Sequence, residues 1–434
     1  MGGNYKPSEF NVIHAMPEGG AVVVNTFSRS VSELDARELR ELKSGNIDEF
    51  SDGEREELAK SGLIIPRDVD EVALLSEGLR RSKRDRTHAT ITVLTTLACN
   101  FECPYCFQSH TSGIMSAEVQ DLVVDHIGTV ASRLLPPCGD DGEYKESELT
   151  LCVTGGEPLL ALPAIRRLVT GAREACSACG VRLVTSMITN GYLLDREVAE
   201  ELGNLSSSWT VQITLDGARD THDGRRRLRG GGRTYDRIVQ NILSLDSDVF
   251  TVKLRINVDR DNLNEIDEVY NWAEGLPNVI PYVAPVTAEE TQDERTRCAC
   301  FLPSEYREFY SAVDSAGLIS DSISSLLQRG TTCAAVHELS CCVDSNGYLY
   351  KCFDKCGQIE YAYAKLGNPE FSKPEREEMF LSRSVTAERE CKDCKFLPQC
   401  LGGCPLAWLE RGTHYCAPAK FLIGGAVERM CSGQ

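Results

Sequence analysis

Three cysteines that stand close together carry the strongest chemical signal in the chain. Cys99, Cys103 and Cys106 have the spacing CxxxCxxC and closely follow the apolar stretch ATITVLTT. Three thiolates on one tight loop can hold three irons of a 4Fe–4S cluster, which leaves the fourth iron without a protein ligand. An open iron can be chelated by the amino and carboxylate groups of a small molecule, whereas structural metal sites close every position. The spacing alone also allows a zinc site completed by a distant fourth cysteine.

The other cysteines are concentrated towards the C-terminus. The chain has 20 cysteines, of which none lies in the first 98 residues and ten lie between residues 333 and 416. In a chain with no recognisable export signal, such clustering indicates metal or cluster ligation rather than disulfides. The densest run taken alone is also compatible with a zinc knuckle. It comprises Cys391, Cys394, Cys400 and Cys404, followed by Cys416.

The elements that must position these cysteines alternate between strands and helices. Strands are predicted at residues 89–95, 148–153, 181–188, 209–215, 251–258 and 279–283, and helices at 117–134, 162–176, 194–202, 235–245 and 263–274. This order implies a parallel sheet with right-handed crossovers. The fold class is therefore α/β, and the six units predict a closed or partly open (β/α)6 barrel.

The two flanks of this core have a different character. Residues 1–85 are predicted to form a winged-helix-like α+β module, with a strand at 20–26, a helix at 33–42 capped by Ser32, and a helix at 52–60. Residues 291–434 are Cys-rich and irregular, with short helices at 303–315 and 319–328 and a hairpin turn at 344–347. Three domains are therefore expected, at residues 1–85, 86–290 and 291–434.

Charge and hydropathy exclude several classes of protein. The chain has 46 Lys and Arg against 65 Asp and Glu, a formal net charge of −19. Such an acidic chain lacks the excess of cations that a general nucleic-acid binder needs. No apolar stretch of about 18 residues predicts a membrane span, and the N-terminus shows no secretory signal. We therefore expect a cytoplasmic protein without a nucleic-acid or membrane partner.

Further motifs fall at the C-terminal ends of the predicted strands. Residues 154–158 (TGGEP) follow the second strand, 189–191 (TNG) the third, 215–217 (LDG) the fourth, and 257–262 (NVDRDN) end the fifth. In a β/α barrel the loops at this edge build the active site.

The cysteine motif with an aromatic at Tyr105, together with the GGEP sequence, resembles the signature of radical S-adenosylmethionine (SAM) enzymes. The resemblance implies that Cys99, Cys103 and Cys106 bind a 4Fe–4S cluster and that SAM caps the open iron. An electron then cleaves SAM to a 5′-deoxyadenosyl radical, which abstracts hydrogen from a C–H bond. For Ser186 and Arg255, packing or a surface salt bridge is the alternative. The residues expected to contact SAM are Tyr105, Gly155, Gly156, Glu157, Ser186, Thr189, Asn190 and Arg255.

The C-terminal cysteines resemble the SPASM extension of radical SAM enzymes, which carries two auxiliary 4Fe–4S clusters. The resemblance implies Cys333, Cys352 and Cys404 as ligands of the first auxiliary cluster. One cysteine of the full pattern is missing, because residues 325–332 contain none. The first cluster then has either an open iron that binds a substrate thiolate, or a fourth ligand from Cys341, Cys342 or Cys356. The expected ligands of the second cluster are Cys391, Cys394, Cys400 and Cys416.

Other residues have weaker assignments. Asp354 is a candidate general base, by resemblance to a carboxylate beside the matching cysteine in a relative. His222 lies in a segment that resembles peptide-modifying radical SAM enzymes, and it is either a site residue or, as we favour, an exposed loop histidine. The remaining cysteines are expected to be small buried hydrophobes: Cys138, Cys152, Cys176, Cys179, Cys298, Cys300 and Cys431.

The resemblance implies an enzyme that matures a ribosomally made precursor peptide. It would bind the leader of this peptide through the N-terminal module and install a cross-link, with a Cys-to-carbon thioether favoured over a carbon–carbon bond. A flavodoxin or ferredoxin would supply electrons. One alternative is an anaerobic sulfatase-type maturase that forms formylglycine, and small-molecule radical chemistry is another. An alternative of another class is a non-catalytic zinc-binding protein.

Overall fold

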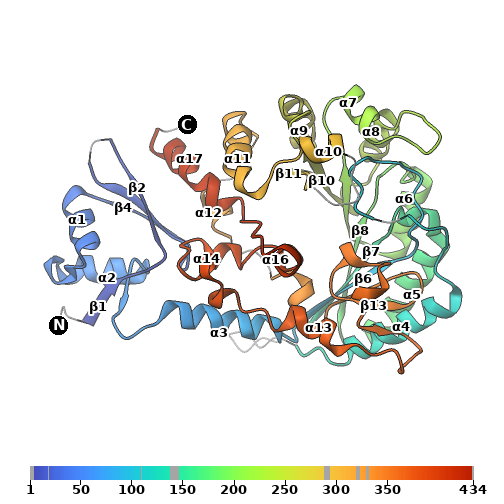
Figure 1. The fold of residues 1–434 in the computed structure, drawn as a ribbon, viewed down its shortest axis with the longest axis horizontal. Helices are drawn as coiled ribbons and strands as arrows, with labels where there is room; N and C mark the ends of the chain where they lie inside the picture. The colour runs from blue at the N-terminus through green and yellow to red at the C-terminus, as the bar shows by residue number, and fades with distance from the viewer. Residues whose placement is uncertain are drawn as a thin grey trace. The chain divides into compact units, whose positions relative to one another are not determined.

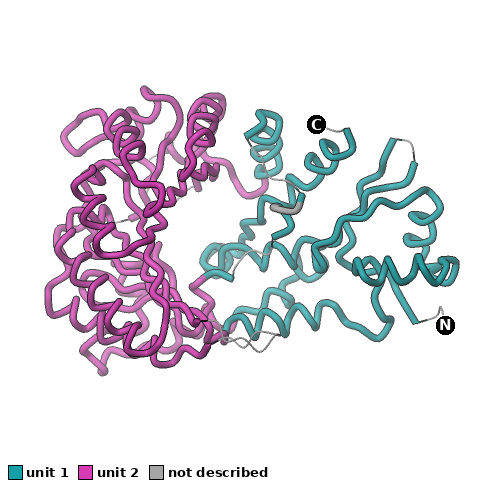
Figure 2. The backbone as a smooth tube through the Cα atoms, turned by 180° about the vertical axis from the view of Figure 1, so that it is seen from behind, with its two compact units in different colours: residues 1–83, 305–333, 383–434 teal, residues 84–304, 334–382 magenta. Residues whose placement is uncertain are grey.

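The structure is a computed structural model that describes residues 4–17, 19–108, 110–136, 146–287, 294–318, 323–328 and 332–432, apart from the side chains of residues 324 and 325. The chain folds into two compact units, each built from separate parts of the sequence (Figure 2). The first unit comprises residues 1–83, 305–333 and 383–434, and the second comprises residues 84–304 and 334–382. The predicted C-terminal domain is thus shared between the units, because residues 334–382 belong with the barrel strands.

The second unit is built on a parallel sheet whose strands follow one another in chain order. All six predicted strands are present, as β6 (His88–Leu94), β7 (Glu148–Thr154), β8 (Arg182–Ile188), β9 (Trp209–Thr214), β10 (Phe250–Val258) and β11 (Val279–Pro285). The far edge of β6 pairs with β12 (Cys341–Val343), which continues into β13 (Tyr348–Tyr350) and β14 (Ala364–Lys365). The sheet is therefore open rather than a closed barrel, and the predicted hairpin extends it.

The predicted helices lie between these strands, and α4 to α6 line one side of the sheet (Figure 1). They are α4 (Ala117–Ala131), α5 (Leu162–Ala178), α6 (Arg196–Leu205), α8 (Tyr235–Leu243) and α9 (Ile266–Glu274). The sequence analysis missed α7 (Arg219–Arg225), which follows the LDG turn. The unit also contains α10 (Glu294–Ala299) and α13 (Pro374–Leu381).

The two faces of the sheet differ in chemistry because successive side chains of a strand point to opposite faces. One face is apolar and almost fully buried, with Ile91, Leu151, Met187, Val211 and Leu254 each at most 1% exposed. The opposite face carries polar side chains in neighbouring register positions, including Thr92, Cys152 and Ser186. The sheet therefore presents a polar inner face, on which Gln212 and Arg255 also lie.

The N-terminal part of the first unit is an α+β module. An antiparallel sheet has the order β2 (Asn11–Ala15), β3 (Ala21–Asn25) and β4 (Ser30–Leu34), and β1 (Tyr5–Pro7) pairs with β5 (Ile64–Pro66). The helices are α1 (Ala36–Ser44), α2 (Asp52–Lys60) and α3 (Glu71–Lys83). The predicted strand at 20–26 and helix at 52–60 are confirmed.

The predicted start of the first helix is wrong. Residues 30–34 form β4, because they pair with the fully buried strand β3. The helix begins at Ala36, and its N-cap is Asp35 rather than Ser32. The Asp35 carboxylate accepts from the Glu38 backbone N–H at 2.7 Å, and the Glu38 carboxylate accepts from the Asp35 N–H at 2.8 Å. This is a complete capping box.

The rest of the first unit is made of short helices around the last cysteines. They are α11 (Tyr306–Ser315), α12 (Ile323–Leu326), α14 (Arg389–Lys392), α15 (Leu397–Cys400), α16 (Pro405–Arg411) and α17 (Ala419–Ser432). The predicted helix at 303–315 is confirmed, whereas residues 319–322 of the predicted 319–328 helix lie outside the described residues. Across the described ranges, no helix combines the length and the apolar character that crossing a bilayer requires.

Candidate metal centre and active site

The loop that carries the three cysteines is held by the backbone of the GGEP segment. The Gly156 N–H donates to the Thr96 carbonyl at 3.0 Å, and the Glu157 N–H donates to the Ala98 carbonyl at 2.8 Å. A Cβ on Gly155 would lie 2.2 Å from the Thr96 oxygen, and one on Gly156 would lie 2.3 Å from the Ala98 oxygen. Only glycine permits so close an approach. The paired glycines therefore fix the segment that leads directly into Cys99.

The structure brings Cys99, Cys103 and Cys106 together, close enough for their charges to interact. They are nevertheless not packed as ligands of one ion. Two sulfurs bound to one zinc at about 2.3 Å are separated by at most about 4.6 Å. Among the described residues, the only His, Cys, Asp or Glu trio whose ligand atoms all lie within 4.8 Å of one another is Glu388, Cys391 and His414. The assignment of the three loop cysteines to a 4Fe–4S cluster stays a prediction.

The three thiols differ in acidity. Burial raises the pKa of Cys99 to about 11 and that of Cys103 to about 12. Burial acts in the same direction on Cys106, but a hydrogen bond from His110 and one from the Gln108 backbone outweigh it, so that the pKa of Cys106 is lowered. Iron binding to Cys99 and Cys103 must therefore displace protons.

A buried arginine that the sequence analysis did not single out lies beside these thiols. Arg226 is 8% exposed, and its charge favours the thiolate forms of all three loop cysteines. Its Nη1 donates to the Tyr105 hydroxyl at 2.7 Å, and its guanidinium lies 5.8 Å from the centre of the Phe101 ring. Its Nε is buried without a hydrogen-bond partner. A fixed cation with an unused donor is able to bind an anionic group at this site.

The Tyr105 side chain joins the cysteine loop to the LDG turn. Its hydroxyl donates to Asp216, which is fully buried and also lies 3.8 Å from Nε of Arg225. A second carboxylate, Asp259, pairs with Arg225 Nη2 at 2.8 Å. Burial raises the pKa of Tyr105 well above its usual range, so the phenol stays neutral. The predicted contact of Tyr105 with SAM stays a prediction.

The interpretation of His222 as an exposed loop residue is wrong. His222 is 0% exposed and lies in α7. Its Nδ1 accepts from the Asp216 N–H at 3.2 Å, so Nε2 carries the proton and donates to Thr234 Oγ1 at 3.1 Å. Thr234 Oγ1 in turn donates to the Arg226 carbonyl at 2.7 Å. Burial and the charges of Arg226 and Arg225 lower the pKa of His222 well below its usual value. His222 is a neutral residue that positions the LDG turn and Arg226.

Glu157 links the ends of two neighbouring strands. One carboxylate oxygen accepts from the Leu159 N–H at 3.0 Å and from Thr189 Oγ1 at 2.7 Å, and the other accepts from the Asn190 N–H at 2.8 Å. Asn190 also donates to the Asn100 side chain in the cysteine loop at 2.7 Å. Burial raises the pKa of Glu157. Thr189, Asn190 and Glu157 thus form one assembly around the loop, and their predicted SAM contacts stay predictions.

Two other predicted SAM residues lie on the polar inner face of the sheet. Ser186 is half-buried and lies beside Cys152, and Arg255 donates to the Asn257 side chain at 2.6 Å. Cys152 is thus not an apolar core residue, because Ser186 and Thr92 hydrogen bond with its thiol. The prediction of burial holds for Cys176 and Cys300 and is wrong for the exposed residues Cys179, Cys298 and Cys431, while Cys138 lies outside the described residues.

A second group of sulfurs lies in the first unit. Cys391, Cys394, Cys400 and Cys416 are close enough for their charges to interact, and Lys420 Nζ donates to Cys416 Sγ at 3.4 Å. His414 Nδ1 lies 3.6 Å from Cys391 Sγ and 3.6 Å from Glu388. These groups could also hold one metal ion, but Arg383 already binds both Glu388 oxygens, at 2.8 and 3.1 Å. The ligation of a second cluster by Cys391, Cys394, Cys400 and Cys416 stays a prediction.

The remaining predicted ligands are divided between the units. Cys333 and Cys404 belong to the first unit and Cys352 to the second, and their grouping into one cluster stays a prediction. Asp354 is half-buried in the 3₁₀ turn η7 (Phe353–Lys355). This turn lies beside the cysteine loop, because the Phe353 and Phe107 rings meet edge to face at 6.0 Å. The role of Asp354 as a base stays a prediction.

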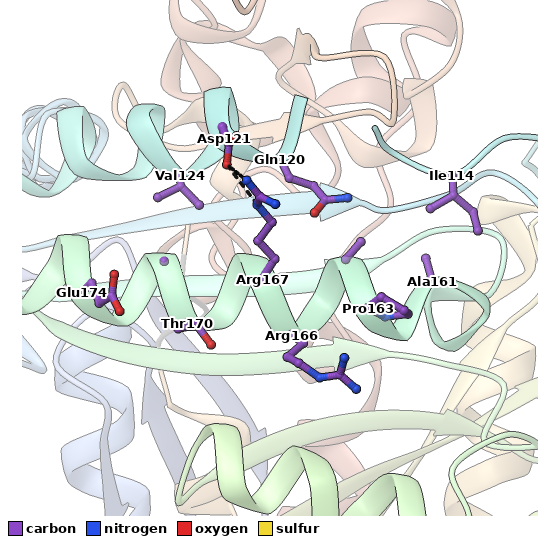
Figure 3. A pocket seen from close by; sticks show the side chains of 12 residues that line it. Ile114, Gln120, Asp121, Val124, Ala161, Pro163, Arg166, Arg167, Thr170 and Glu174 are labelled. Carbon is purple, nitrogen blue, oxygen red and sulfur yellow. Dashed lines mark hydrogen bonds and ion pairs between the residues drawn. The ribbon is translucent and has the colours of Figure 1, made fainter. Parts of the chain in front are cut away.

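A groove of about 800 Å³ lies elsewhere on the second unit, between α4 and α5 (Figure 3). Its lining includes Ile114, Val124 and Pro163, and Arg167 pairs with Asp121 across it at 2.5 Å. It contains no cysteine and none of the predicted SAM residues. The groove is therefore not the candidate active site.

Comparisons with known proteins agree with this geometry. The family model described as "Radical SAM superfamily" matches residues 93–273. The cysteine-type anaerobic sulfatase-maturating enzyme of Clostridium novyi is 22% identical over 343 residues, which cover 70% of this chain and 84% of that protein. Fe-coproporphyrin III synthase of Methanosarcina barkeri is 26% identical over 183 residues, which cover 41% of this chain but only 39% of that protein.

Solved structures share the fold. Native anSMEcpe with bound AdoMet and Cp18Cys peptide matches with a TM-score of 0.58 at 20% identity, covering 80% of this chain and 98% of that chain. Streptococcus suis SuiB bound to S-adenosylmethionine matches with a TM-score of 0.50 at 14% identity, covering 94% of this chain and 97% of that chain.

Proposed function

We propose that this chain, which is a radical SAM enzyme, modifies a residue of a peptide substrate. The observation that carries the proposal is the cysteine loop, which the GGEP backbone fixes at the C-terminal edge of an open parallel sheet. The three sulfurs of this loop suit a 4Fe–4S cluster with one open iron, and Arg226 supplies a buried cation beside them. When bound, the reduced cluster and SAM supply a radical that removes hydrogen from a C–H bond.

The residues around the loop have separate tasks in this proposal. Cys99, Cys103 and Cys106 hold three irons, and Arg226 offsets the negative charge of cluster and cosubstrate. Gly155 and Gly156 keep the loop in place, and Glu157 ties it to Thr189 and Asn190. Tyr105, Glu157, Thr189 and Asn190, with Ser186 and Arg255 on the polar face, form the SAM pocket. Because the strand ends converge here, the reacting carbon must enter from this edge.

Two features support a peptide as the substrate. The sulfatase-maturating relatives and the solved structure with a bound Cys peptide are similar to most of this chain. The N-terminal module contains a three-stranded sheet, which offers a site for a leader that binds as an added strand. The predicted strand β3 is the central one, so a leader must pair at an edge, along β2 or β4.

The favoured product is a thioether between a cysteine sulfur and a carbon of the same peptide. In this reaction a C–H and an S–H bond break and one C–S bond forms. In this chain Asp354 could take the thiol proton; the bound SAM would supply the radical that takes the hydrogen atom, and an iron–sulfur centre would accept the remaining electron. Two auxiliary 4Fe–4S clusters would suit this transfer, and their expected ligands are Cys333, Cys352 and Cys404 for the first and Cys391, Cys394, Cys400 and Cys416 for the second. A flavodoxin or ferredoxin would reduce the first cluster.

A formylglycine-forming maturase is the second candidate, because the curated relative of that type matches over 84% of its length. The match to anSMEcpe covers 98% of that chain but 80% of this one, so part of this chain has no counterpart there. The two products differ in mass. A thioether or carbon–carbon cross-link removes two hydrogens from the peptide, whereas formylglycine from cysteine loses the sulfur.

Anaerobic purification followed by iron, sulfide and zinc analysis tests the proposal first. About twelve irons per chain are expected for three 4Fe–4S clusters, and stoichiometric zinc without iron would overturn the proposal in favour of a zinc-binding protein. A Cys-containing peptide encoded beside the gene is then incubated with the reduced enzyme and SAM, and its mass is measured. The variant with Cys99, Cys103 and Cys106 replaced by Ala is the control, and it must leave the peptide unchanged.

A further inference from the structure

A run of arginines lies directly against the cysteine loop. Residues 225–233, here called the arginine segment, have the sequence RRRLRGGGR and connect α7 to α8 (Figure 1). The Glu102 N–H donates to the Arg227 carbonyl at 3.0 Å, and the Arg229 N–H donates to the Asn100 carbonyl at 2.8 Å. The residues between these two bonds form an antiparallel bridge. The backbone of the segment is therefore paired with the residues that separate the first two cysteines of the loop.

A glycine turn gives the arginine segment its shape. The Gly231 N–H donates to the Leu228 carbonyl at 3.0 Å. Gly230 and Gly231 have φ angles of +80° and +88°, in the left-handed region that glycine adopts readily. The turn separates two exposed arginines, with Arg229 before the glycines and Arg233 after them.

Three arginine side chains of the segment face solvent. The Arg227 side chain is 55% exposed, and its Nε lies 3.9 Å from a Glu102 carboxylate oxygen. The Arg233 side chain is 74% exposed, and its Nη1 lies 3.7 Å from a carboxylate oxygen of Asp220. Ion pairs this long and this exposed are weak. No acidic side chain among the described residues forms an ion pair with Arg229, so the three cations are available to a partner.

The charge of this region is opposite to that of the chain. Residues 219–237 contain seven arginines and three aspartates, a net charge of +4, whereas the whole chain has a net charge of −19. Most of the protein surface therefore repels an acidic partner, and a local concentration of exposed cations attracts one. Charge complementarity thus indicates a partner with an acidic surface at the arginine segment.

The position of the segment indicates what this partner does. Glu102 and Pro104 are exposed and stand on either side of Cys103, so the cysteine loop reaches the surface beside the arginines. A protein bound there lies next to the loop that is expected to hold the SAM-binding cluster. This cluster needs an electron from outside the chain. The peptide, by contrast, is expected at the polar inner face of the sheet and its leader at the N-terminal module.

We propose that Arg227, Arg229 and Arg233 form the docking surface of an acidic electron-transfer protein. One electron passes from the reduced donor to the cluster of the cysteine loop, so that the donor is oxidised and the cluster is reduced. This inference rests on the proposed function, because it requires a cluster at the loop. Exposed charges of this kind act mainly on the rate of association, by about 10- to 1000-fold, and their effect falls as salt is added.

The test uses a reduced flavodoxin with an acidic surface as the donor and compares the unmodified, full-length, reconstituted chain with R227Q/R229Q/R233Q. Calorimetry measures the dissociation constant of the pair, and chromatography measures 5′-deoxyadenosine formation. We expect the unmodified protein to bind flavodoxin more weakly as NaCl is raised from about 50 to about 300 mM. At low salt the variant should bind about tenfold more weakly and should lose most of the salt dependence. With dithionite, which needs no docking surface, both proteins should form the product at the same rate.

Two control variants separate charge from other effects. R227K/R229K/R233K keeps all three charges and should bind flavodoxin as the unmodified protein does. The second control removes three exposed arginines near the opposite edge of the sheet, where the strands begin, and should also bind normally. It is R133Q/R173Q/R182Q.

Four results would overturn the inference. In the first, R227Q/R229Q/R233Q binds flavodoxin as tightly as the unmodified protein. In the second, the lysine variant loses binding as the glutamine variant does. In the third, the glutamine variant binds flavodoxin normally but no longer modifies the peptide with dithionite, which would assign the segment to the peptide. If the glutamine variant does not fold, flavodoxin binding to the unmodified protein that is insensitive to salt is the fourth. A loaded protein that forms no product with dithionite contradicts the proposed function instead, while the binding measurements still judge the docking surface.

Discussion

Replacing Gly156 with alanine tests the contact that holds the cysteine loop. The added Cβ would lie 2.3 Å from the Ala98 oxygen and 2.6 Å from the Leu97 oxygen, where ordinary contacts begin at 3.4 Å. Both obstacles are backbone atoms, so the loop must move by about 1 Å to relieve the clash. Such a move breaks the hydrogen bonds that Gly156 and Glu157 donate to this loop.

The expected cost follows from these two effects. Overpacking costs about 1–3 kcal/mol, and each buried backbone hydrogen bond that is lost costs about 1 kcal/mol more. We therefore expect G156A to destabilise the second unit by about 3–5 kcal/mol and to lower the iron retained after reconstitution. Urea unfolding followed by circular dichroism, together with iron analysis, measures both quantities.

A matched control exists in the same unit. Gly224 lies in α7, and a Cβ there would meet nothing within 4 Å. G224A should leave the iron content unchanged and should stabilise the protein by up to about 1 kcal/mol, through helix propensity. If G156A unfolded at the same urea concentration as the unmodified protein and kept all its iron, the proposed tether between the GGEP segment and the cysteine loop would be refuted.

Three further predictions follow from the same structure. In the cofactor-free protein, iodoacetamide should label Cys106 at a lower pH than Cys103, because the pKa of Cys106 is lowered and that of Cys103 is raised. Peptide mass spectrometry after labelling at a series of pH values measures the pH at which each thiol reacts. R226Q removes the buried cation that donates to the Tyr105 hydroxyl and interacts with Asp216, and should cost about 1–3 kcal/mol in urea unfolding, whereas R227Q, whose side chain is 55% exposed, should cost under about 1 kcal/mol. D35A removes a capping box and should cost the N-terminal module about 1 kcal/mol, and an unchanged midpoint would contradict the assigned cap.

The sequence predicts the core of the fold because its patterns are local. Alternating apolar strands and helices of ordinary length indicate all six parallel strands, and the turn at residues 344–347 indicates the hairpin. The start of the first helix was missed because Ser32 and Asp35 offer two overlapping caps. Pairing of residues 30–34 with the buried strand β3 decides between them, and such long-range pairing is not visible in local sequence.

The sequence predicts only part of the candidate site, because contacts between residues far apart in the chain are not visible in local sequence. The cysteines and the GGEP motif can be recognised from their spacing in the sequence. That Gly155 and Gly156 contact the cysteine loop can be seen only in the folded structure. Arg226 stands in a run of three arginines in the sequence, and nothing local distinguishes it from the exposed Arg227. His222 was predicted to be exposed because its sequence neighbours are hydrophilic. In the structure it is buried and hydrogen bonds with the Asp216 N–H and with Thr234.

The central claim is that three thiolates leave one iron open and that SAM binds there and is cleaved. The most direct test incubates the reconstituted, dithionite-reduced protein with SAM under anaerobic conditions and quantifies 5′-deoxyadenosine by chromatography. We predict that the unmodified protein forms this product and that the variant with Cys99, Cys103 and Cys106 replaced by Ala forms none. If a protein with fully loaded iron–sulfur clusters formed no 5′-deoxyadenosine, or if the variant formed as much as the unmodified protein, the account would be contradicted.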